Sequence, residues 1–266
     1  MFLTVGQLDI PSGEISGAIV QGVLERSGHH VRLVYGSYRE LMDGFVGGSV
    51  DVLTAVFLPH AHAGWEQIRD HAVEVGALYS GARYVWSVPG YVPPALVESI
   101  ADLARPNVQG RLARSVLAVR GTAGAALSAS AVREYELAGL GYTVADETFS
   151  HWIRRCRTAA AAGEWFVIAL PHPHFLHDEC GLRVLADPLG VMGGEIRSAI
   201  VARREVAEAM PKSARDTLSR IRMDPDTLVD LETRMHETQG TPRATVRAWL
   251  DARPELLAEW RGAARD

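Results

Sequence analysis

The sequence is poor in lysine and cysteine, and each shortage argues against a class of chemistry. Lys212 is the only lysine and lies in a polar, proline-led segment, which disfavours a lysine Schiff base or a phosphate-binding loop. Cys156 and Cys180 are too few for a disulfide framework and leave room for a single bridge at most. Cys156 lies inside a helical pattern, and no cysteine–histidine arrangement is visible in the sequence. We therefore expect a buried thiol there.

Basic clusters and long apolar runs are also lacking. The formal net charge is -5, so we expect no nucleic-acid partner. No run of about 18 apolar residues occurs, so we expect no membrane span. The first residues lack the basic start, apolar run and cleavage site of a signal peptide, so the chain as written is expected to be cytoplasmic. We expect no cofactor.

Hydrophobic residues make up 47% of the 266 residues, enough for a large core in one or two domains. Strand and helix patterns alternate at the start of the chain, which predicts a parallel sheet covered by helices. A second α/β unit follows, and after Asp187 the pattern is mainly helical. The expected strands are 2–8, 31–34, 50–58, 84–88, 115–119, 143–145 and 165–170, and the expected helices are 15–27, 38–47, 98–104, 125–137, 151–162, 213–222, 225–237 and 241–250.

Two histidine pairs follow predicted strands, and they are the most informative feature of the sequence. His60 and His62 follow the strand that ends at Leu58, and His172 and His174 follow the strand that ends at Leu170. Strand ends usually line the ligand crevice of an α/β sheet, so two such ends suggest two lobes facing one cleft.

The roles of these histidines stay open at this point. All four imidazoles could hold a transition metal together with Asp9 or Glu14, although no metal is our main expectation. General acid–base chemistry is the more plausible catalytic role, with His62, His172 and Glu14 as the candidates. In the plainest interpretation, His62 and His172 are pocket or structural residues, and His60 and His174 are exposed.

Three further segments are candidates for the ligand site. Asp9 and Glu14 lie between the first strand and helix, where they contact a ligand or act as a base, while Ser12 caps the helix. Thr122 lies in a glycine-flanked turn before a helix, where free amides favour a carboxylate. His151 and Trp152 are either pocket residues or ordinary packing at the start of a helix.

Ordered motifs over about 240 residues resemble the glycine betaine/proline-betaine substrate-binding proteins of ABC importers. They are Gly48-Ser49-Val50-Asp51 with Leu58-Pro59 and His62, Val88-Pro89-Gly90-Tyr91-Val92, Ser99-Ile100-Ala101-Asp102-Leu103, Pro171-His172, Leu185-Ala186-Asp187-Pro188, and Ala248-Trp249-Leu250 with Trp260. The resemblance implies an α/β fold of the type II periplasmic-binding-protein kind, with two lobes, a hinge and a central ligand cleft. It implies lobe 1 at 1–84 and 189–266 and lobe 2 at 85–188, and its members are normally extracytoplasmic.

The departures from the family concern its aromatic cage for a quaternary ammonium group. Phe57 and Ala169 stand where the motifs have tryptophan, and the glycine loop has no aromatic residue. Trp86, Tyr91 or Trp152 are candidates to rebuild the cage.

Two classes of function follow. The first is a small-molecule binding protein for a small zwitterion or carboxylate, with Thr122 at the carboxylate, Phe57, Trp86 and Tyr91 at the other end, and an ABC permease as partner if exported. The remaining ligand candidates are Asp9, Glu14, His60, His62, His151 and His172. The alternative is a cytoplasmic enzyme of the lyase, cyclase or isomerase type, or a ligand sensor, so whether the chain is an enzyme stays open.

Overall fold

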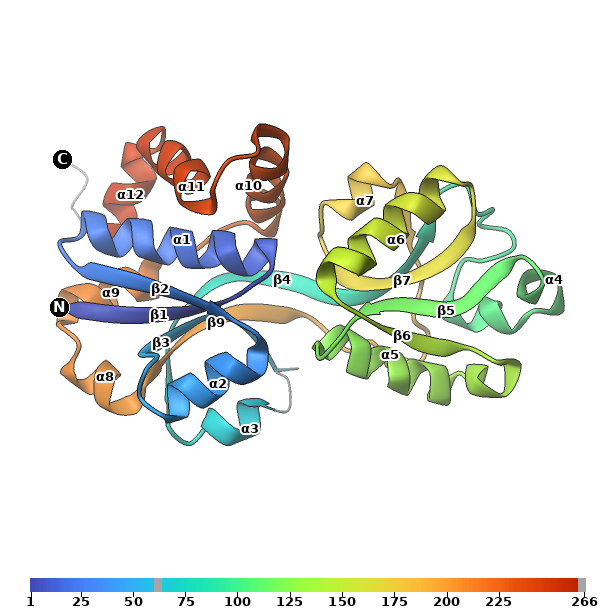
Figure 1. Cartoon of the computed structure of the whole chain (residues 1–266), viewed down its shortest axis with the longest axis horizontal. Helices are drawn as coiled ribbons and strands as arrows, with labels where there is room; N and C mark the ends of the chain where they lie inside the picture. The colour runs from blue at the N-terminus through green and yellow to red at the C-terminus, as the bar shows by residue number, and fades with distance from the viewer. Residues whose placement is uncertain (60–63, 263–266) are drawn as a thin grey trace. The chain divides into compact units, whose positions relative to one another are not determined.

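The computed structural model describes residues 1–59 and 64–262. The chain forms two compact units, one made of Met1–Gly81 with Ile196–Asp266 and the other of Ala82–Glu195. We refer to them as unit 1 and unit 2. Each unit has its own sheet with helices on both faces (Figure 1).

Unit 1 is built on a sheet in the order β2-β1-β3-β9-β4. The strands β1, β2 and β3 are parallel, as the alternating pattern predicts, whereas β9 runs antiparallel to β3. The helix α1 lies on one face of this sheet beneath α10 to α12, and α2 and α3 cover the other face (Figure 1). The elements are β1 Phe2–Leu8, α1 Pro11–Arg26, β2 His30–Gly36, α2 Tyr38–Val46, β3 Val52–Leu58, α3 Gly64–Ile68, β4 Ala72–Pro89, β9 Ile196–Arg203, α8 Arg204–Ala209, α9 Lys212–Arg220, α10 Pro225–Thr238, α11 Pro242–Asp251 and α12 Pro254–Arg261.

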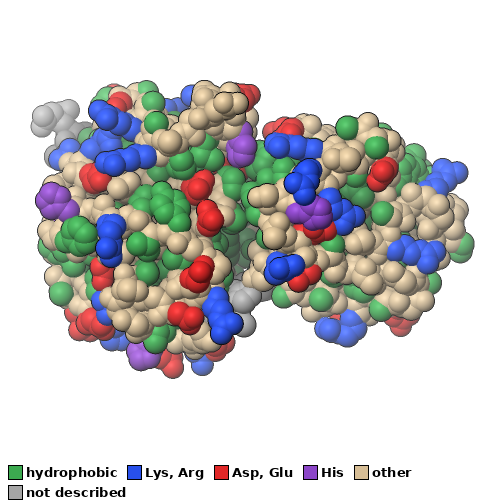
Figure 2. Space-filling model, in the orientation of Figure 1, with side chains coloured by type: hydrophobic (Ala, Val, Ile, Leu, Met, Phe, Trp, Pro, Cys, Tyr) green, Lys and Arg blue, Asp and Glu red, His purple; other side chains and the backbone are tan. Residues whose placement is uncertain are grey.

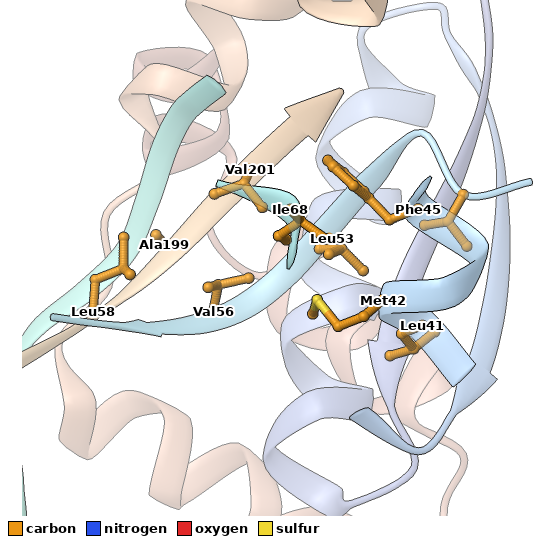
Figure 3. Packing of buried hydrophobic residues seen from close by; sticks show 10 residues of the cluster. Leu41, Met42, Phe45, Leu53, Val56, Leu58, Ile68, Ala199 and Val201 are labelled. Carbon is orange, nitrogen blue, oxygen red and sulfur yellow. The ribbon is translucent and has the colours of Figure 1, made fainter. Parts of the chain in front are cut away.

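A hydrophobic core lies between β3, β9 and the helices α2 and α3. Phe45 and Ile68 have no exposed surface, and they pack against Leu53 and Val56 (Figure 3). Burying one such side chain contributes roughly 1.5–3 kcal/mol. Ser37 begins α2 with a capping box, in which its hydroxyl accepts from the Glu40 amide and the Glu40 carboxylate accepts from the Ser37 amide.

Unit 2 contains the second part of β4, paired with β7 and β8, in the order β4-β7-β5-β6. The strands β5, β6 and β7 are parallel, and β4 is antiparallel to β7. The helices α6 and α7 lie on one face of the sheet and α5 lies on the other (Figure 1). The further elements are η1 Ile100–Ala104, α4 Pro106–Gln109, β5 Leu112–Val119, α5 Ala123–Glu134, η2 Leu137–Leu140, β6 Thr143–Glu147, α6 Phe149–Ala161, β7 Trp165–His172, α7 Leu176–Glu179 and β8 Leu182–Val184.

The structure corrects three of the predicted elements. The region after Asp187 is not only helical, because Ile196–Arg203 forms the buried strand β9. The strand expected at 84–88 extends back to Ala72. The helix expected at 15–27 begins at Pro11. The first turn of a helix leaves its amide hydrogens without partners, and proline suits this position because it has no amide hydrogen.

Among the described residues, no helix combines the length and the apolar character needed to cross a membrane. On the face shown in Figure 2, acidic and basic side chains are interspersed over each unit.

Candidate functional site

The carboxyl ends of β5, β6 and β7 meet at one edge of the sheet in unit 2, because these strands are parallel. We call this the carboxyl edge of unit 2. Thr122 follows β5, His151 follows β6 in the first turn of α6, and His172 is the last residue of β7. The structure therefore brings three of the predicted ligand residues to the same edge.

Thr122 is the N-cap of α5. Its hydroxyl oxygen accepts from the Ala125 amide at 3.3 Å and donates to the Val119 carbonyl at 2.8 Å. The amides of Ala123 and Gly124, in the first turn, have no carbonyl within the helix to bond to. Together with the helix dipole, these amides create a positive potential that suits a carboxylate.

Tyr84 supplies an aromatic ring beside this helix end, and it was not among the ligand residues predicted from the sequence. A Cβ atom at Gly124 would lie 3.1 Å from Cδ1 of Tyr84, so the glycine lets the ring pack closely against α5. Tyr84 belongs to β4, where it pairs with Pro171 of β7. The only sequence signal was an aromatic residue near a predicted strand end, and without the register its neighbours could not be known.

Charged groups at the start of α6 neutralise one another. Glu147, at the end of β6, accepts from Nη1 of Arg155 at 2.7 Å and is also paired with Nδ1 of His151. The hydrogen bond from Arg155, followed by that from His151, holds the pKa of Glu147 below its usual range. In the same way, Arg120 is bonded to Asp146 at 2.9 Å.

Trp152 is buried and lies among aromatic rings at the start of α6. Its ring centroid lies 5.6 Å from that of Phe149 and 5.5 Å from that of His174. Its indole N–H has no hydrogen-bond partner among the described residues. The Trp152 ring is thus packed while its donor is unused, and a role in the ligand pocket stays a prediction.

The rings of His172 and His174 contact different aromatic rings. The strand β7 ends at His172, so the alternation that would place both imidazoles on one face does not reach His174. The His172 ring lies 4.8 Å from that of His177, whereas His174 stacks on Phe175 at 4.5 Å. The alternative in which His174 is exposed is wrong, because the residue is only 7% exposed.

His177 was not singled out in the sequence, yet its surroundings disfavour the charged form of its ring. Its Nδ1 donates to the His174 carbonyl at 3.1 Å, so its Nε2 is left to accept from the Ser87 hydroxyl at 3.2 Å. Burial, followed by the neighbouring charge of His172, lowers the pKa of His177 to about 4.

The histidine metal site receives no support from the described residues. Within the ranges 1–59 and 64–262, no group of three or more histidine, cysteine, aspartate or glutamate side chains is arranged to hold a metal ion. His60 and His62 lie outside the described residues.

Trp86 and Tyr91 do not lie at the carboxyl edge of unit 2. Trp86 pairs with Ala169 inside the sheet, has no exposed surface, and donates its indole N–H to the Ser128 hydroxyl at 2.8 Å. Tyr91 follows the end of β4 and donates to the Glu164 carbonyl at 2.6 Å, next to the start of β7. Because β4 and β7 are antiparallel, this is the opposite end of the sheet from His172.

In unit 1, Asp9 and Glu14 flank the start of α1. Partial burial, followed by the negative charge of Asp9, raises the pKa of Glu14, and His236 of α10 opposes this shift. Ser12 does not cap the helix as expected, because α1 begins at Pro11 with Ile10 as its N-cap. The Ser12 carbonyl instead accepts from the Ser16 hydroxyl at 2.6 Å.

Phe57 is half-buried on β3 of unit 1. Its ring centroid lies 6.5 Å from that of Tyr79 on β4, at an interplanar angle of 55°. Tyr79 was missed in the sequence because the first half of β4 was not predicted. Unit 1 thus places an aromatic pair near the end of β3.

The family model described as the substrate binding domain of the ABC-type glycine betaine transport system matches residues 3–252. The chain belongs to this family. It is therefore a small-molecule binding protein of the ABC transporter type, and the comparisons give no support to the enzyme alternative. No curated protein matches the chain.

Solved structures of similar proteins show the same fold. The glycine betaine, L-proline-binding protein ProX from Borrelia burgdorferi has a TM-score of 0.84 and 18% identity, over 98% of this chain and 96% of that one. Lactococcal OpuAC in complex with glycine betaine has a TM-score of 0.86 and 18% identity, over 97% and 98%. An ABC-transporter choline-binding protein in complex with choline has a TM-score of 0.85 and 16% identity, over 99% and 92%.

Proposed function

We propose that this chain is the substrate receptor of an ABC importer and that its ligand is a small zwitterion with a carboxylate. The observation that carries the proposal is the family match over residues 3–252. The similar proteins are described as binding glycine betaine, L-proline or choline, all small molecules with a cationic nitrogen.

The carboxylate of the ligand is proposed to bind at the start of α5. The amides of Ala123 and Gly124 are the available donors there, with Thr122 holding the turn. The nearby Arg120 and Arg155 are already bonded to Asp146 and Glu147, so backbone amides rather than a guanidinium group are expected to bind the anion.

On unit 1, taken by itself, the carboxylates of Asp9 and Glu14 provide negative charge for a cationic group. Phe57 and Tyr79 add aromatic faces, which attract a cation through their quadrupoles. The motif resemblance implies tryptophan at the positions of Phe57 and Ala169, so fewer aromatic rings are expected around the ligand here. We therefore expect carboxylates to supply part of the attraction for its cationic group that aromatic rings supply in other family members.

The test is calorimetric titration with glycine betaine, proline betaine, carnitine, choline and simple carboxylates. We expect the carboxylate-bearing ammonium compounds to bind at least about 10-fold more tightly than choline, a difference of about 1.4 kcal/mol. Metal-stripped protein is titrated with zinc in parallel. A response to zinc alone, with none to any ammonium compound, would sink the proposal.

We further propose that the partner is the permease of an ABC importer. The family supports this partner, since its description names an ABC-type transport system. In proteoliposomes that contain such an importer, the ligand-loaded chain should raise the ATPase rate, and the ligand-free chain should raise it less. Equal rates with and without the chain would contradict this partner.

A further inference from the structure

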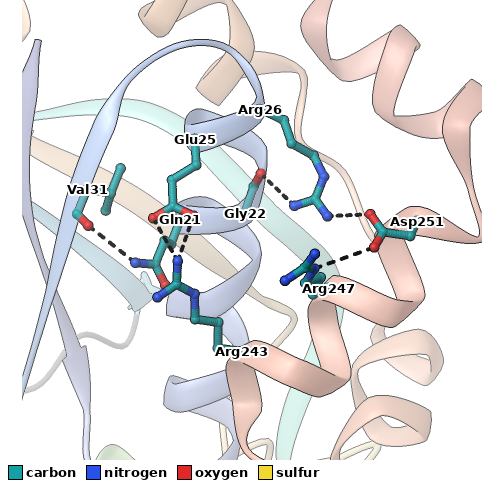
Figure 4. Close-up of polar contacts among 8 residues, drawn as sticks. All are labelled: Gln21, Gly22, Glu25, Arg26, Val31, Arg243, Arg247 and Asp251. Carbon is teal, nitrogen blue, oxygen red and sulfur yellow. Dashed lines mark hydrogen bonds and ion pairs between the residues drawn. The ribbon is translucent and has the colours of Figure 1, made fainter.

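A small cleft lies between the helices α1 and α11 of unit 1. Its volume of about 320 Å³ is at the lower end of the range of about 300 to 1,000 Å³ for small-molecule sites. Its polar walls are formed by Gln21 and Glu25 of α1 and by Arg243 and Arg247 of α11 (Figure 4). None of these residues belongs to the candidate ligand residues described above, so a molecule bound here is a second ligand.

Gln21 brings an acceptor without a partner to this cleft. The residue is only 7% exposed, although it lines the cleft. Its Nε2 donates to the Val31 carbonyl at 3.2 Å, which fixes the orientation of the amide. Its Oε1 is buried and has no hydrogen-bond partner among the described residues. Such an acceptor costs free energy until a donor reaches it, so the cleft favours a ligand with a hydroxyl or amine hydrogen.

Basic side chains outnumber acidic ones at the cleft by one. Arg26 is bonded to Asp251 at 2.5 Å and is therefore occupied. Arg243 reaches Glu25 only at 3.3 and 3.5 Å, in both cases from Nη2. Arg247 forms an ion pair with Asp251 at 3.7 Å and donates no hydrogen bond to any described residue. These long, exposed pairs contribute little stability, so Arg243 and Arg247 can turn to an anion at small cost.

We propose that this cleft binds a small hydroxycarboxylate with one negative charge. Its carboxylate accepts from Arg243 and Arg247, whose planar groups of donors suit it, and its hydroxyl donates to Oε1 of Gln21. The single negative charge balances the excess positive charge of the cleft. A dianion such as phosphate fits less well, because the carboxylates of Glu25 and Asp251 repel it.

An NMR titration of the full, isotope-labelled chain with sodium lactate tests this site, with sodium chloride at the same concentrations as the control for ionic strength. We expect the amides of Gln21, Arg243 and Arg247 to shift along one saturation curve. Propionate lacks the hydroxyl and should bind here at least about 5-fold more weakly. Alanine, in which an ammonium group replaces the hydroxyl and cancels the net charge, should also bind more weakly than lactate.

Variants separate the contributions of the side chains. Arg243→Gln and Arg247→Gln, at positions that are 70% and 76% exposed, should each weaken lactate binding at least about 5-fold. The matched control is Arg234→Gln, which removes an exposed arginine of α10 outside the cleft and should leave lactate binding unchanged. Gln21→Met should remove the preference for lactate over propionate, and urea unfolding checks that this variant is folded.

Propionate that binds the unaltered chain as tightly as lactate would overturn the proposal without any variant. Equal weakening by Arg234→Gln, or tighter binding of alanine than of lactate, would also overturn it. The same holds if lactate causes no shifts in α1 and α11, including the case in which its shifts are confined to Ala123 and Gly124 of unit 2. That last result would leave the carboxylate site of the proposed function standing and remove only the second site.

Discussion

The protonation of His177 is set by its surroundings in unit 2. One nitrogen donates to a backbone carbonyl and the other accepts from Ser87, so the ring is bonded on both sides as a neutral group. A proton added to Nε2 would reverse the second bond, with the Ser87 hydroxyl as acceptor, and would charge a largely buried group. The folded state therefore disfavours the proton that the unfolded chain takes up near pH 6.5.

This difference predicts a loss of stability in acid. Because the pKa of His177 is about 4 when folded and 6.5 when unfolded, the stabilisation is present above pH 6.5 and is lost as the pH falls toward 4. The loss should reach roughly 3 kcal/mol at pH 4. Urea unfolding between pH 4 and 7 checks it, and His177→Gln should flatten the profile in that window. His71→Gln, at an exposed position, is the matched control, and an equal flattening there would contradict the assignment.

Thr122 gives the second prediction at this scale. Thr122→Ala removes the cap of α5 and should lower the free energy of unfolding by about 1 kcal/mol, whereas Thr122→Ser should retain most of it. The alanine variant should also bind carboxylate ligands several-fold more weakly, because the first-turn amides are no longer held in place. Denaturant titration and calorimetry check both effects. A serine variant as weak as the alanine variant would argue against the cap.

The sequence predicted the position in the fold of some candidate residues well and of others poorly, for a physical reason. The positions of Thr122, His151 and His172 were predictable because each lies at or just after the end of a strand in a parallel βαβ pattern, and such strands end at one edge. Tyr91 could not be placed in the same way, because a sequence does not reveal that β4 runs antiparallel to β7. Tyr84 and Trp152 depend on register and ring packing, which only the fold provides.

At the scale of elements, β9 is the most instructive miss. Ile196–Arg203 contains a nearly continuous apolar run with no helical or alternating period, which is typical of a strand buried on both faces. This strand was not predicted, because the pattern that follows it is mainly helical and the whole region was interpreted in that way. By contrast, β1 was predicted with its observed bounds, because its apolar run is isolated by a turn on its carboxyl side.

The attachment of α11 to α1 supports a prediction for a pair of elements. Ion pairs cross this contact, including Arg26 with Asp251 at 2.5 Å, whose side chains are 25% and 55% exposed (Figure 4). Next to them, Leu250 has no exposed surface and packs over Gly22. Exposed pairs contribute less than about 1 kcal/mol, whereas truncation of a buried leucine costs about 2–5 kcal/mol.

We therefore expect Leu250→Ala to lower the free energy of unfolding by at least about 2 kcal/mol and Asp251→Asn by less than about 1 kcal/mol. Denaturant unfolding at low and high salt measures both. Only the second variant should lose its effect as salt rises. A larger loss for Asp251→Asn would mean that charge, not packing, attaches α11.

At the scale of the whole molecule, the fold is shown while the ligand stays a proposal. The TM-scores of 0.84 to 0.86 go with identities of only 16–18%, so the pattern of strands and helices is retained although most side chains differ. Function depends on the particular side chains of the site, and the motif resemblance implies tryptophan where this chain has Phe57 and Ala169. The expected cytoplasmic location likewise stays a prediction.

The two units carry buried ionisable groups whose effects on stability oppose each other. In unit 1, Glu232 of α10 is 2% exposed, and burial raises its pKa to about 8. The unfolded chain releases this proton near pH 4.5, so the stability of unit 1 falls as the pH rises from there toward 8. In unit 2, His177 acts in the opposite direction between pH 4 and 6.5.

From pH 5 to pH 8, unit 1 should therefore lose roughly 3 kcal/mol through Glu232, while unit 2 gains roughly 2 kcal/mol through His177. Hydrogen exchange, corrected for intrinsic rates, measures each unit through the slowest amides of its own central strands, β3 and β5. Glu232→Gln should remove the loss in unit 1 and leave unit 2 unchanged, and His177→Gln should do the reverse. If either variant changed the stability of both units equally, the two units would unfold as one cooperative block. The opposing pH dependences would then belong to the whole chain and not to the separate units.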